Sequence, residues 1–220
     1  MPDHLQLLSP QARRVAFLIL PLMYLAGLIG LNVPATASLF RLLTPFNLIA
    51  SLGLLLLFHT DWRPSFGLYC IVAFVLGFVA ELIGVHTGLL FGEYSYGSVL
   101  GWKVAEVPLT IGTNWLMLTY LCGSVVDRLP LKVPLKMLLA AGLMTLLDVL
   151  IEPVAIHLGF WTWHTATIPL ANYLGWYGVS GGIFMVFYLL PFKKTNALAP
   201  LLLLLQFLFF GLNGVALRLT

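Results

Sequence analysis

Seven long apolar runs, separated by short polar breaks, constrain the fold of this chain more than any other feature. Of its 220 residues, 60% are hydrophobic and 9% are charged, and its mean hydropathy is +1.00. Soluble domains do not reach these values, whereas a membrane-spanning helix needs about 20 apolar residues. The sequence therefore predicts an all-α polytopic membrane protein. We expect a single transmembrane domain, residues 1–220, with about seven helices at 15–31, 38–58, 66–85, 108–126, 133–151, 173–190 and 198–217.

The basic residues are spread unevenly over the predicted loops. If the loops alternate between the two sides of the membrane, eight Lys and Arg residues lie on the side of the amino terminus, and Arg41, Lys103 and Arg218 lie on the other. Lys and Arg concentrate on the cytoplasmic side of membrane proteins. We therefore expect an integral protein of the cell (inner) membrane, with its amino terminus in the cytoplasm and its carboxyl terminus outside. The sequence has no basic stripe, so no nucleic-acid partner is expected.

One short motif, an acid followed by a histidine and a glycine, occurs twice. Its copies are Glu81, His86 and Gly88, and Glu152, His157 and Gly159. All three pairs are 71 residues apart. Ionisable groups inside a membrane are costly and by default mark a functional site. The spacing also indicates an internal repeat, in which the third and fourth helices with their loop resemble the fifth and sixth.

Both copies of the motif are followed by a long aromatic loop. Pro153 directly follows Glu152, and the residue before a proline is pushed out of the helical region, so we expect the fifth helix to end or kink there. Glycines after Glu81 predict a similar break. Non-helical backbone at membrane depth is tolerated only where it is buried or lines a cavity, so both outer loops are candidates for a re-entrant lining. The first, second and seventh helices, nearly free of ionisable groups, are expected to be scaffold.

Three carboxyl groups are the candidate acids of such a site: Glu81, Asp148 and Glu152. Positions four apart lie on one helix face, so Asp148 and Glu152 are expected to stack as a pair and to share one proton. A carboxyl group in a poorly solvated pocket can stay neutral and act as a Brønsted acid. The alternative is that each acid is structural and is hydrogen-bonded to a neighbouring helix.

Two histidines accompany these acids, and three roles are open to them. His86 and His157 could be catalytic bases or supports, interfacial residues, or metal ligands. Membrane di-iron enzymes use many clustered histidines, whereas this chain has five, so no metal is expected. A retinal Schiff base needs a lysine in the last span, which has none. Nucleotide-binding motifs are also absent from the sequence, and we expect no cofactor.

Aromatic and amide side chains surround the repeated motif. An aromatic belt at the membrane interface is their default explanation, but beside the acids some could face a cavity and stabilise a cation. The two asparagines could orient a water molecule or an acid. The candidate substrate-binding residues are Tyr94, Tyr96, Asn114, Trp115, Trp161, Trp163, Asn172 and Trp176.

Several of these residues belong to a recognisable set between positions 77 and 182. The set consists of Glu81 with His86, residues 91–96, 107–108 and 114–115, Asp148 with 152–153, and residues 161–163, 168–169, 172 and 175–176. Together they resemble the carotenoid biosynthesis membrane protein family, which contains the CruF-type carotenoid 1,2-hydratases. The flanking helices match this family in hydrophobic character alone.

The resemblance implies addition of water across the terminal C1–C2 double bond of an acyclic carotenoid end group, leaving a tertiary alcohol. It implies water and an apolar carotenoid taken from the lipid bilayer as substrates, and other membrane enzymes of carotenoid biosynthesis as candidate partners. The residues suit acid catalysis. Asp148 or Glu152 would donate the proton, and Glu81 would position or share it. His86 or His157 would orient and deprotonate the water.

Two other functions are open at this point. A membrane carotenoid cyclase, of the kind that acts on lycopene, begins with the same protonation but traps the cation with an internal alkene. A small transporter or lipid-binding membrane protein could use the acids to relay protons, although its pathway should be polar at both membrane faces. The two halves are expected to differ, because Gly77 stands where Asp148 falls in the second copy. We expect the second copy to hold the proton donor.

Overall fold

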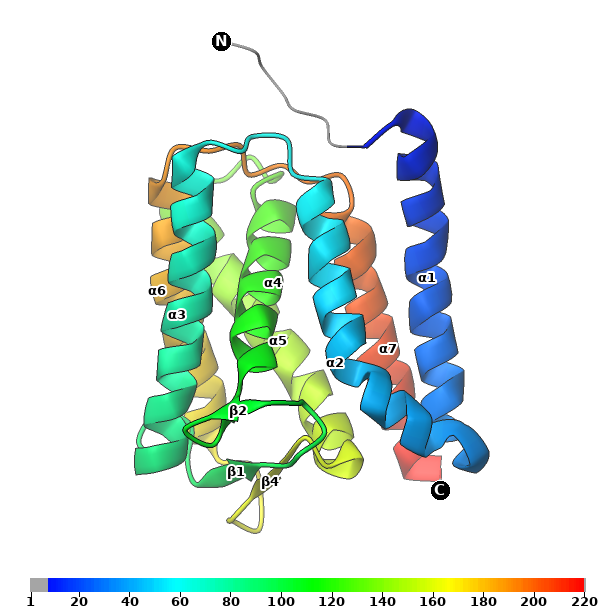
Figure 1. The fold of residues 1–220 in the computed structure, drawn as a ribbon. Coiled ribbons are helices and arrows are strands. Elements are labelled where there is room, and N and C mark those ends of the chain that lie inside the picture. The colour runs from blue at the N-terminus through cyan, green and yellow to red at the C-terminus, as the bar shows by residue number, and fades with distance from the viewer. Residues whose placement is uncertain (1–7, 220) are drawn as a thin grey trace.

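The computed structural model describes residues 8–219, which form seven helices and four short strands (Figure 1). Six of these helices are long and apolar enough to cross a membrane, which confirms the predicted all-α polytopic membrane fold. The seventh, α6, has 20 residues and packs beside α3 and α5. The helices are α1 (Pro10–Asn32), α2 (Pro34–Leu57), α3 (Pro64–Thr87), α4 (Leu109–Val126), α5 (Val133–Leu158), α6 (Leu170–Leu189) and α7 (Ala199–Leu219).

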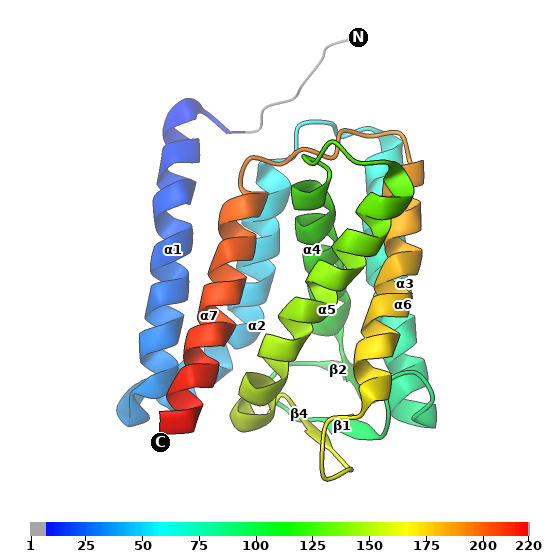
Figure 2. The same ribbon diagram turned by 180° about the vertical axis from the view of Figure 1, so that it is seen from behind.

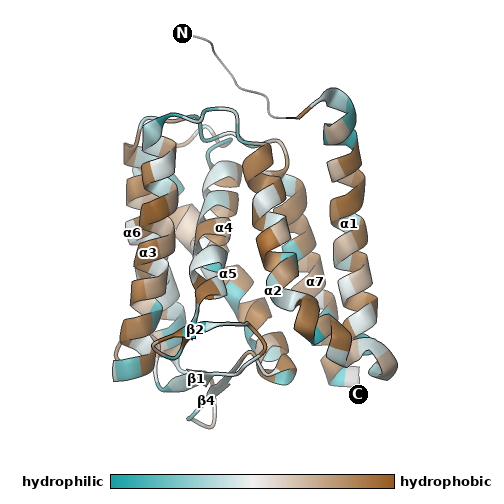
Figure 3. Cartoon of the chain, viewed as in Figure 1, coloured by the Kyte–Doolittle hydropathy of each residue, from teal (hydrophilic) through white to brown (hydrophobic). Residues whose placement is uncertain are grey.

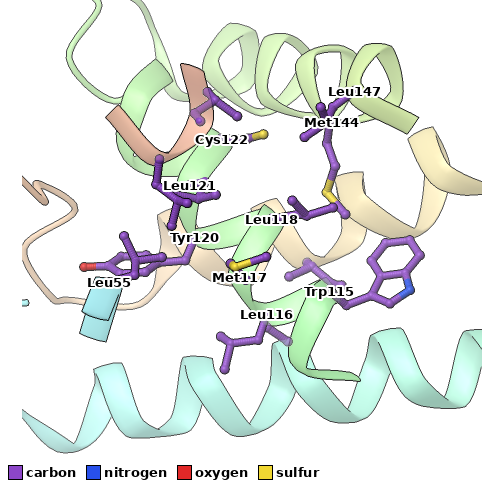
Figure 4. Close-up of a cluster of buried hydrophobic side chains, with 14 of the residues drawn as sticks. Leu55, Trp115, Leu116, Met117, Leu118, Tyr120, Leu121, Cys122, Met144 and Leu147 are labelled. Carbon is purple, nitrogen blue, oxygen red and sulfur yellow. The ribbon is translucent and has the colours of Figure 1, made fainter. Parts of the chain in front are cut away.

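The core of the molecule lies around α4, which five other helices surround. α4 contacts α2, α3, α5, α6 and α7, and Figure 4 shows its apolar side chains with Leu55 of α2 and with Met144 and Leu147 of α5. α1 lies at the edge of the bundle, beside α2 and α7 (Figure 1, Figure 2). The outer helices carry many exposed apolar side chains, as a surface in contact with lipid requires. Figure 3 shows hydrophobic residues along much of their length.

Prolines and glycines set the ends of several helices. Proline occupies the first turn of α1, α2, α3 and α5, where its missing N–H costs no helical hydrogen bond. Gly88 and Gly159, the glycines of the repeated motif, cap α3 and α5 with φ angles of 68° and 74°. Glycine adopts this left-handed conformation without the steric cost that other residues meet. The motif therefore marks the ends of two helices.

The predicted break soon after Glu81 comes at Gly88, whereas the predicted end of the fifth helix at Glu152 is wrong. α3 continues past Glu81 to Thr87, and α5 continues past Glu152 to Leu158 with Pro153 inside it. A membrane helix tolerates a proline where neighbouring helices and local adjustments satisfy the freed backbone groups. α5 is packed in this way against α4, α6 and α7. Both acids consequently lie within regular helix, before its last turn.

The two aromatic loops pair with each other below the ends of α3 and α5, in the orientation of Figure 1. β1 (Tyr94–Tyr96) runs antiparallel to β4 (Trp161–Trp163), with Tyr94 opposite Trp163. A separate hairpin joins β2 (Lys103–Val104) to β3 (Val107–Pro108). The predicted loops therefore take the form of a two-stranded ribbon, in which the backbone groups of each loop bond to the other.

The ribbon relates the two halves of the repeat by a local two-fold axis. Gly97 N–H donates to the Phe160 carbonyl at 2.8 Å, and at the related position His164 N–H donates to the Glu93 carbonyl at 2.9 Å. Each half consists of a long helix with a glycine cap, a strand and a second helix. The halves are α3, β1 and α4, and α5, β4 and α6. The predicted internal repeat is therefore present in the fold.

Candidate active site

A small chamber lies where the two halves meet. The ends of α3 and α5, the first turns of α4 and α6, and the β1–β4 ribbon surround it, and its volume is about 20 Å³. We call it the carboxyl chamber, because a glutamate from each half faces it. Its lining consists of Glu81, Phe91, Tyr94, Tyr96, Ile111, Asn114, Trp115, Glu152, Trp161, Trp163, Asn172 and Trp176.

Glu81 of the first half accepts three hydrogen bonds. The Tyr94 and Tyr96 hydroxyls donate to its Oε2 at 2.5 and 2.7 Å, and Trp115 Nε1 donates to its Oε1 at 2.9 Å. The side chain is 4% exposed. Buried carboxyl groups need such partners because their desolvation is costly. The ribbon and α4 thus fix both oxygens of Glu81.

Glu152 of the second half has a different set of donors. Trp161 and Trp163 donate to its Oε2 at 3.1 and 2.8 Å, and Asn172 Nδ2 donates to its Oε1 at 3.1 Å. The same Asn172 amide donates to Asp148 Oδ2 at 2.8 Å. The predicted stack of Asp148 and Glu152 is therefore present, and one amide bridges it.

Asp148 is the most isolated of the three carboxyl groups. Its side chain is fully buried, and its Oδ1 has no hydrogen-bond partner among residues 8–219. A bare buried carboxylate oxygen is costly, whereas a carboxylic acid can carry its proton there. Asp148 does not line the chamber, and it is Glu152 that faces this space, joined to Asp148 through the Asn172 amide. The geometry therefore makes the Asp148–Glu152 pair the best place beside the chamber to hold a proton.

The tyrosines that hold Glu81 are fixed as donors. Burial, reinforced by the adjacent Glu81 carboxyl group, raises the pKa of the Tyr94 and Tyr96 hydroxyls above their usual value. A phenol with a raised pKa stays protonated and continues to donate. Neither hydroxyl is therefore suited to act as a base near neutral pH.

The difference between the halves has a steric origin. Gly77 of α3 corresponds to Asp148 of α5, and a Cβ at Gly77 would overlap the side chain of Trp115. Trp115 itself stacks on its repeat counterpart Trp176, with ring centroids 4.6 Å apart and an interplanar angle of 24°. In the first half, an indole thus occupies the space that a second carboxyl group would need.

The histidines of the motif lie away from the acids. His86 is exposed, and its Nε2 lies 3.2 Å from the Ala105 carbonyl in the turn between β2 and β3. His157 is exposed at the end of α5. Neither of these described residues lines the carboxyl chamber. Within residues 8–219, no three His, Cys, Asp or Glu side chains are grouped so that they could hold a metal ion.

The sequence-predicted substrate-binding residues gather around the chamber. All eight line it, together with Glu81 and Glu152. Phe91 and Ile111 also line it, although sequence reasoning did not single them out as site residues. Phe91 lies within the aromatic segment of the first loop and could have been found there, whereas Ile111 looks like any other apolar residue of a span.

A larger apolar cavity adjoins the chamber. Its volume is about 380 Å³, and it lies among α1, α2, α4, α5, β4 and α7. The expectation that α1, α2 and α7 are scaffold alone is therefore incomplete. Ile111, Asn114 and Trp161 line both spaces. The remaining lining residues are Met23, Tyr24, Ala26, Gly27, Leu31, Phe40, Leu43, Thr44, Phe46, Asn47, Leu48, Ala50, Leu100, Ile151, Leu158, Phe160, Gln206, Phe209 and Phe210.

Comparison with known proteins identifies a family and one similar protein. Residues 18–217 match the family described as carotenoid biosynthesis protein. The chain is also similar to the bisanhydrobacterioruberin hydratase of Haloarcula japonica, with 26% identity over a region covering 62% of this chain and 48% of that relative. The chain thus spans about half the length of the curated relative it matches. No solved structure matches it.

Proposed function

Because the chain belongs to the carotenoid biosynthesis protein family, we propose that it is a hydratase that adds water across the terminal C1–C2 double bond of an acyclic carotenoid. The observation that carries this proposal is the carboxyl chamber, in which two differently bonded carboxyl centres adjoin a large apolar cavity. The cavity suits a polyene chain, and the chamber suits the acid chemistry of its end. The similarity to a hydratase supports the same reaction.

The Asp148–Glu152 pair donates the proton in this proposal. A terminal trisubstituted alkene accepts a proton at C2, its less substituted carbon, so that the π electrons form the new C–H bond and C1 becomes a tertiary cation. Two neighbouring carboxyl groups that share one proton can deliver it as a general acid. The Asn172 amide, bonded to both groups, holds them in register.

The cation that follows needs negative charge and electron-rich faces around it. Glu81 supplies the charge, fixed by three donors before any substrate arrives, as electrostatic catalysis requires. The indoles of Trp115 and Trp161 in the chamber wall supply π faces, which stabilise a cation by roughly 0.5–2 kcal/mol.

Water then bonds to C1 and loses a proton. A cavity needs roughly 10–15 Å³ to hold one water molecule, which also requires two to four polar partners. The chamber, with about 20 Å³, meets the first condition, and Glu81, Glu152 and Asn114 offer polar atoms for the second. Glu81 accepts the proton of the water, and its return to the Asp148–Glu152 pair completes the cycle. The two exposed motif histidines have no step in this scheme.

The reaction leaves the overall oxidation state unchanged, so the scheme uses water and carotenoid without a redox cofactor. In this proposal the carotenoid comes from the bilayer of the cell membrane. The excess of Lys and Arg in the loops at the amino-terminal side supports a cytoplasmic position for that side. The chamber then lies toward the outer leaflet. Other membrane enzymes of carotenoid biosynthesis are the partners that this substrate supply implies.

Expression in a bacterium that makes an acyclic carotene such as lycopene tests the function. We expect a pigment heavier by one water. An isomer of unchanged mass would instead identify a cyclase. Unaltered pigment in strains that supply several acyclic carotenes would contradict both enzymes and leave the transporter or lipid-binding alternative.

A further inference from the structure

The two-fold relation of the halves implies two related ways into the carboxyl chamber. Trp115 and Trp176, which stack on each other, each lie seven positions after the proline that precedes their helix, Pro108 and Pro169. Counted in the same way, Gly175 is the counterpart of Asn114. Asn114 borders both the chamber and the apolar cavity. A symmetric molecule would have a second opening beside Gly175.

The opening beside Gly175 is filled. A Cβ at this glycine would overlap the Leu90 carbonyl oxygen and the Phe91 ring. Phe91 is 1% exposed and forms part of the chamber wall. The segment that carries it has no equivalent in the second half, because Tyr94 follows Gly88 by six positions whereas Trp161 follows Gly159 by two. The extra residues of the first loop therefore close this side.

The opening beside Asn114 leads to the apolar cavity. Three residues, Ile111, Asn114 and Trp161, line both spaces and so form their boundary. The Asn114 amide makes no hydrogen bond to any described residue, so its donors and acceptor face the boundary unpaired. Such a group favours a polar ligand atom at this position, because an unpaired amide next to an apolar ligand is costly.

The bend of α2 shapes the outer wall of this cavity. Figure 1 shows α2 changing direction in its amino-terminal half, which contains Pro45, and proline is the usual cause of such a kink. Cavity-lining residues lie on both sides of Pro45, from Phe40 to Ala50. Leu43 and Phe46 of this wall have large exposed apolar surfaces, as a wall that faces lipid requires.

We infer that an acyclic polyene enters end first from the lipid through this cavity, and that its end group passes Asn114 into the chamber while Phe91 closes the related opening. The inference rests on the proposed function for the identity of the ligand. Asn114 is a positioning residue: its amide holds the attacking water or the new hydroxyl at the boundary. Because the route ends at Phe91, a carotene with two reactive ends must leave and re-enter to react twice.

A matched pair of substitutions tests this route. Both Ala50 and its neighbour Ile49 are exposed, but Ala50 lines the cavity and Ile49 lies outside the lining. Ala50→Trp and Ile49→Trp would be purified from lycopene-producing cells, and the pigment retained per protein measured by visible absorption. We expect Ala50→Trp to retain at least about ten-fold less pigment than wild type and Ile49→Trp to retain as much as wild type. Equal retention in both variants, or no pigment in wild type, would overturn the route.

The same preparations separate this inference from the proposed function. Pigment retained in wild type, lost in Ala50→Trp and never hydrated would leave the route standing and contradict the hydratase. For Asn114, we expect Asn114→Leu to retain pigment but to hydrate it about ten-fold more slowly, as loss of one positioned polar contact predicts. We expect Asn114→Gln to recover part of the hydration rate, because it keeps the amide. A role in packing alone would give no such recovery. Unchanged hydration in Asn114→Leu would remove this residue from the proposal.

Discussion

The two halves of the repeat hold their glutamates with different chemistry on the same frame. Two phenols and an indole donate to Glu81, whereas two indoles and an amide donate to Glu152, and the amide also reaches Asp148. The first half therefore has one firmly held acceptor, and the second has a pair of carboxyl groups. The two halves share one fold, and a few substituted positions make the site between them asymmetric.

The asymmetry has the form that acid-catalysed hydration needs. A carboxylic acid that donates its proton is neutral until the transfer, so a second carboxylate that is already charged can stabilise the cation while it forms. Placing the donor in one half and the acceptor in the other separates these tasks across a space large enough for one water.

Removing the donor should have the largest effect. Asp148→Asn and Glu152→Gln are each expected to lower the rate of hydration about 10²–10⁴-fold, the range of a lost general acid. The rate is measured as hydrated pigment formed per purified protein. Glu106→Gln is the matched control, because Glu106 is exposed beside Lys103 and lies outside the chamber. A fully active Asp148→Asn variant would remove the pair from the mechanism.

Substitutions in the first half should lower the rate of hydration less than those in the second half. Glu81→Gln removes the charge that faces the cation, and we expect a rate about 10²-fold lower, comparable to the loss of an electrostatic contact. Tyr94→Phe keeps the charge and removes one donor, so a reduction of about ten-fold is expected in the same assay. If Glu81→Gln lowered the rate more than Glu152→Gln does, the first half would be the proton donor and the second half the acceptor.

The close contact between Gly77 and Trp115, which distinguishes the first half, can be tested by measuring the stability of a variant. Gly77→Ala places a methyl group against Trp115, and such overpacking costs about 1–3 kcal/mol. Gly67→Ala in the same helix is the control, since a Cβ there meets nothing within 4 Å. We expect thermal unfolding in detergent to occur at lower temperature in the first variant alone. Equal unfolding temperatures would show that the Gly77 position tolerates a side chain.

The smallest effect concerns the tyrosines of the first half. Since the pKa of Tyr96 is raised, its hydroxyl should remain protonated when the pH reaches about 10, the ordinary pKa of tyrosine. Raising the pH from neutral to that value increases the tyrosinate absorbance of the protein. We expect this increase to be the same in Tyr96→Phe as in wild type. A smaller gain in the variant would show that Tyr96 ionises normally and is less buried than the structure indicates.

The sequence predicted the membrane fold and the repeat well, because long apolar runs and a duplicated motif are local signals. It failed at the end of α5, where packing around the helix outweighs the preference of Pro153 to end it. Gly88 and Gly159 carried the correct signal, since glycine is the usual cap of a helix.

The chamber was more predictable than the route to it. The acids and aromatic residues stand out in an apolar chain, and the structure brings them together. His86 and His157 share the spacing of the motif but point elsewhere, because five positions along a helix lead to a different face. The cavity of α1, α2 and α7 is lined mostly by ordinary apolar residues, so no sequence pattern distinguishes it from scaffold.

The most direct test follows the atoms of the water. Purified protein would be supplied with an acyclic carotene in water labelled with deuterium and with heavy oxygen, and the product examined by mass spectrometry and NMR. The account predicts one deuterium on C2 and the labelled oxygen on C1 of each new tertiary alcohol, with the product missing in Glu152→Gln. An isomer of unchanged composition, or a hydroxyl oxygen that does not come from water, would contradict it.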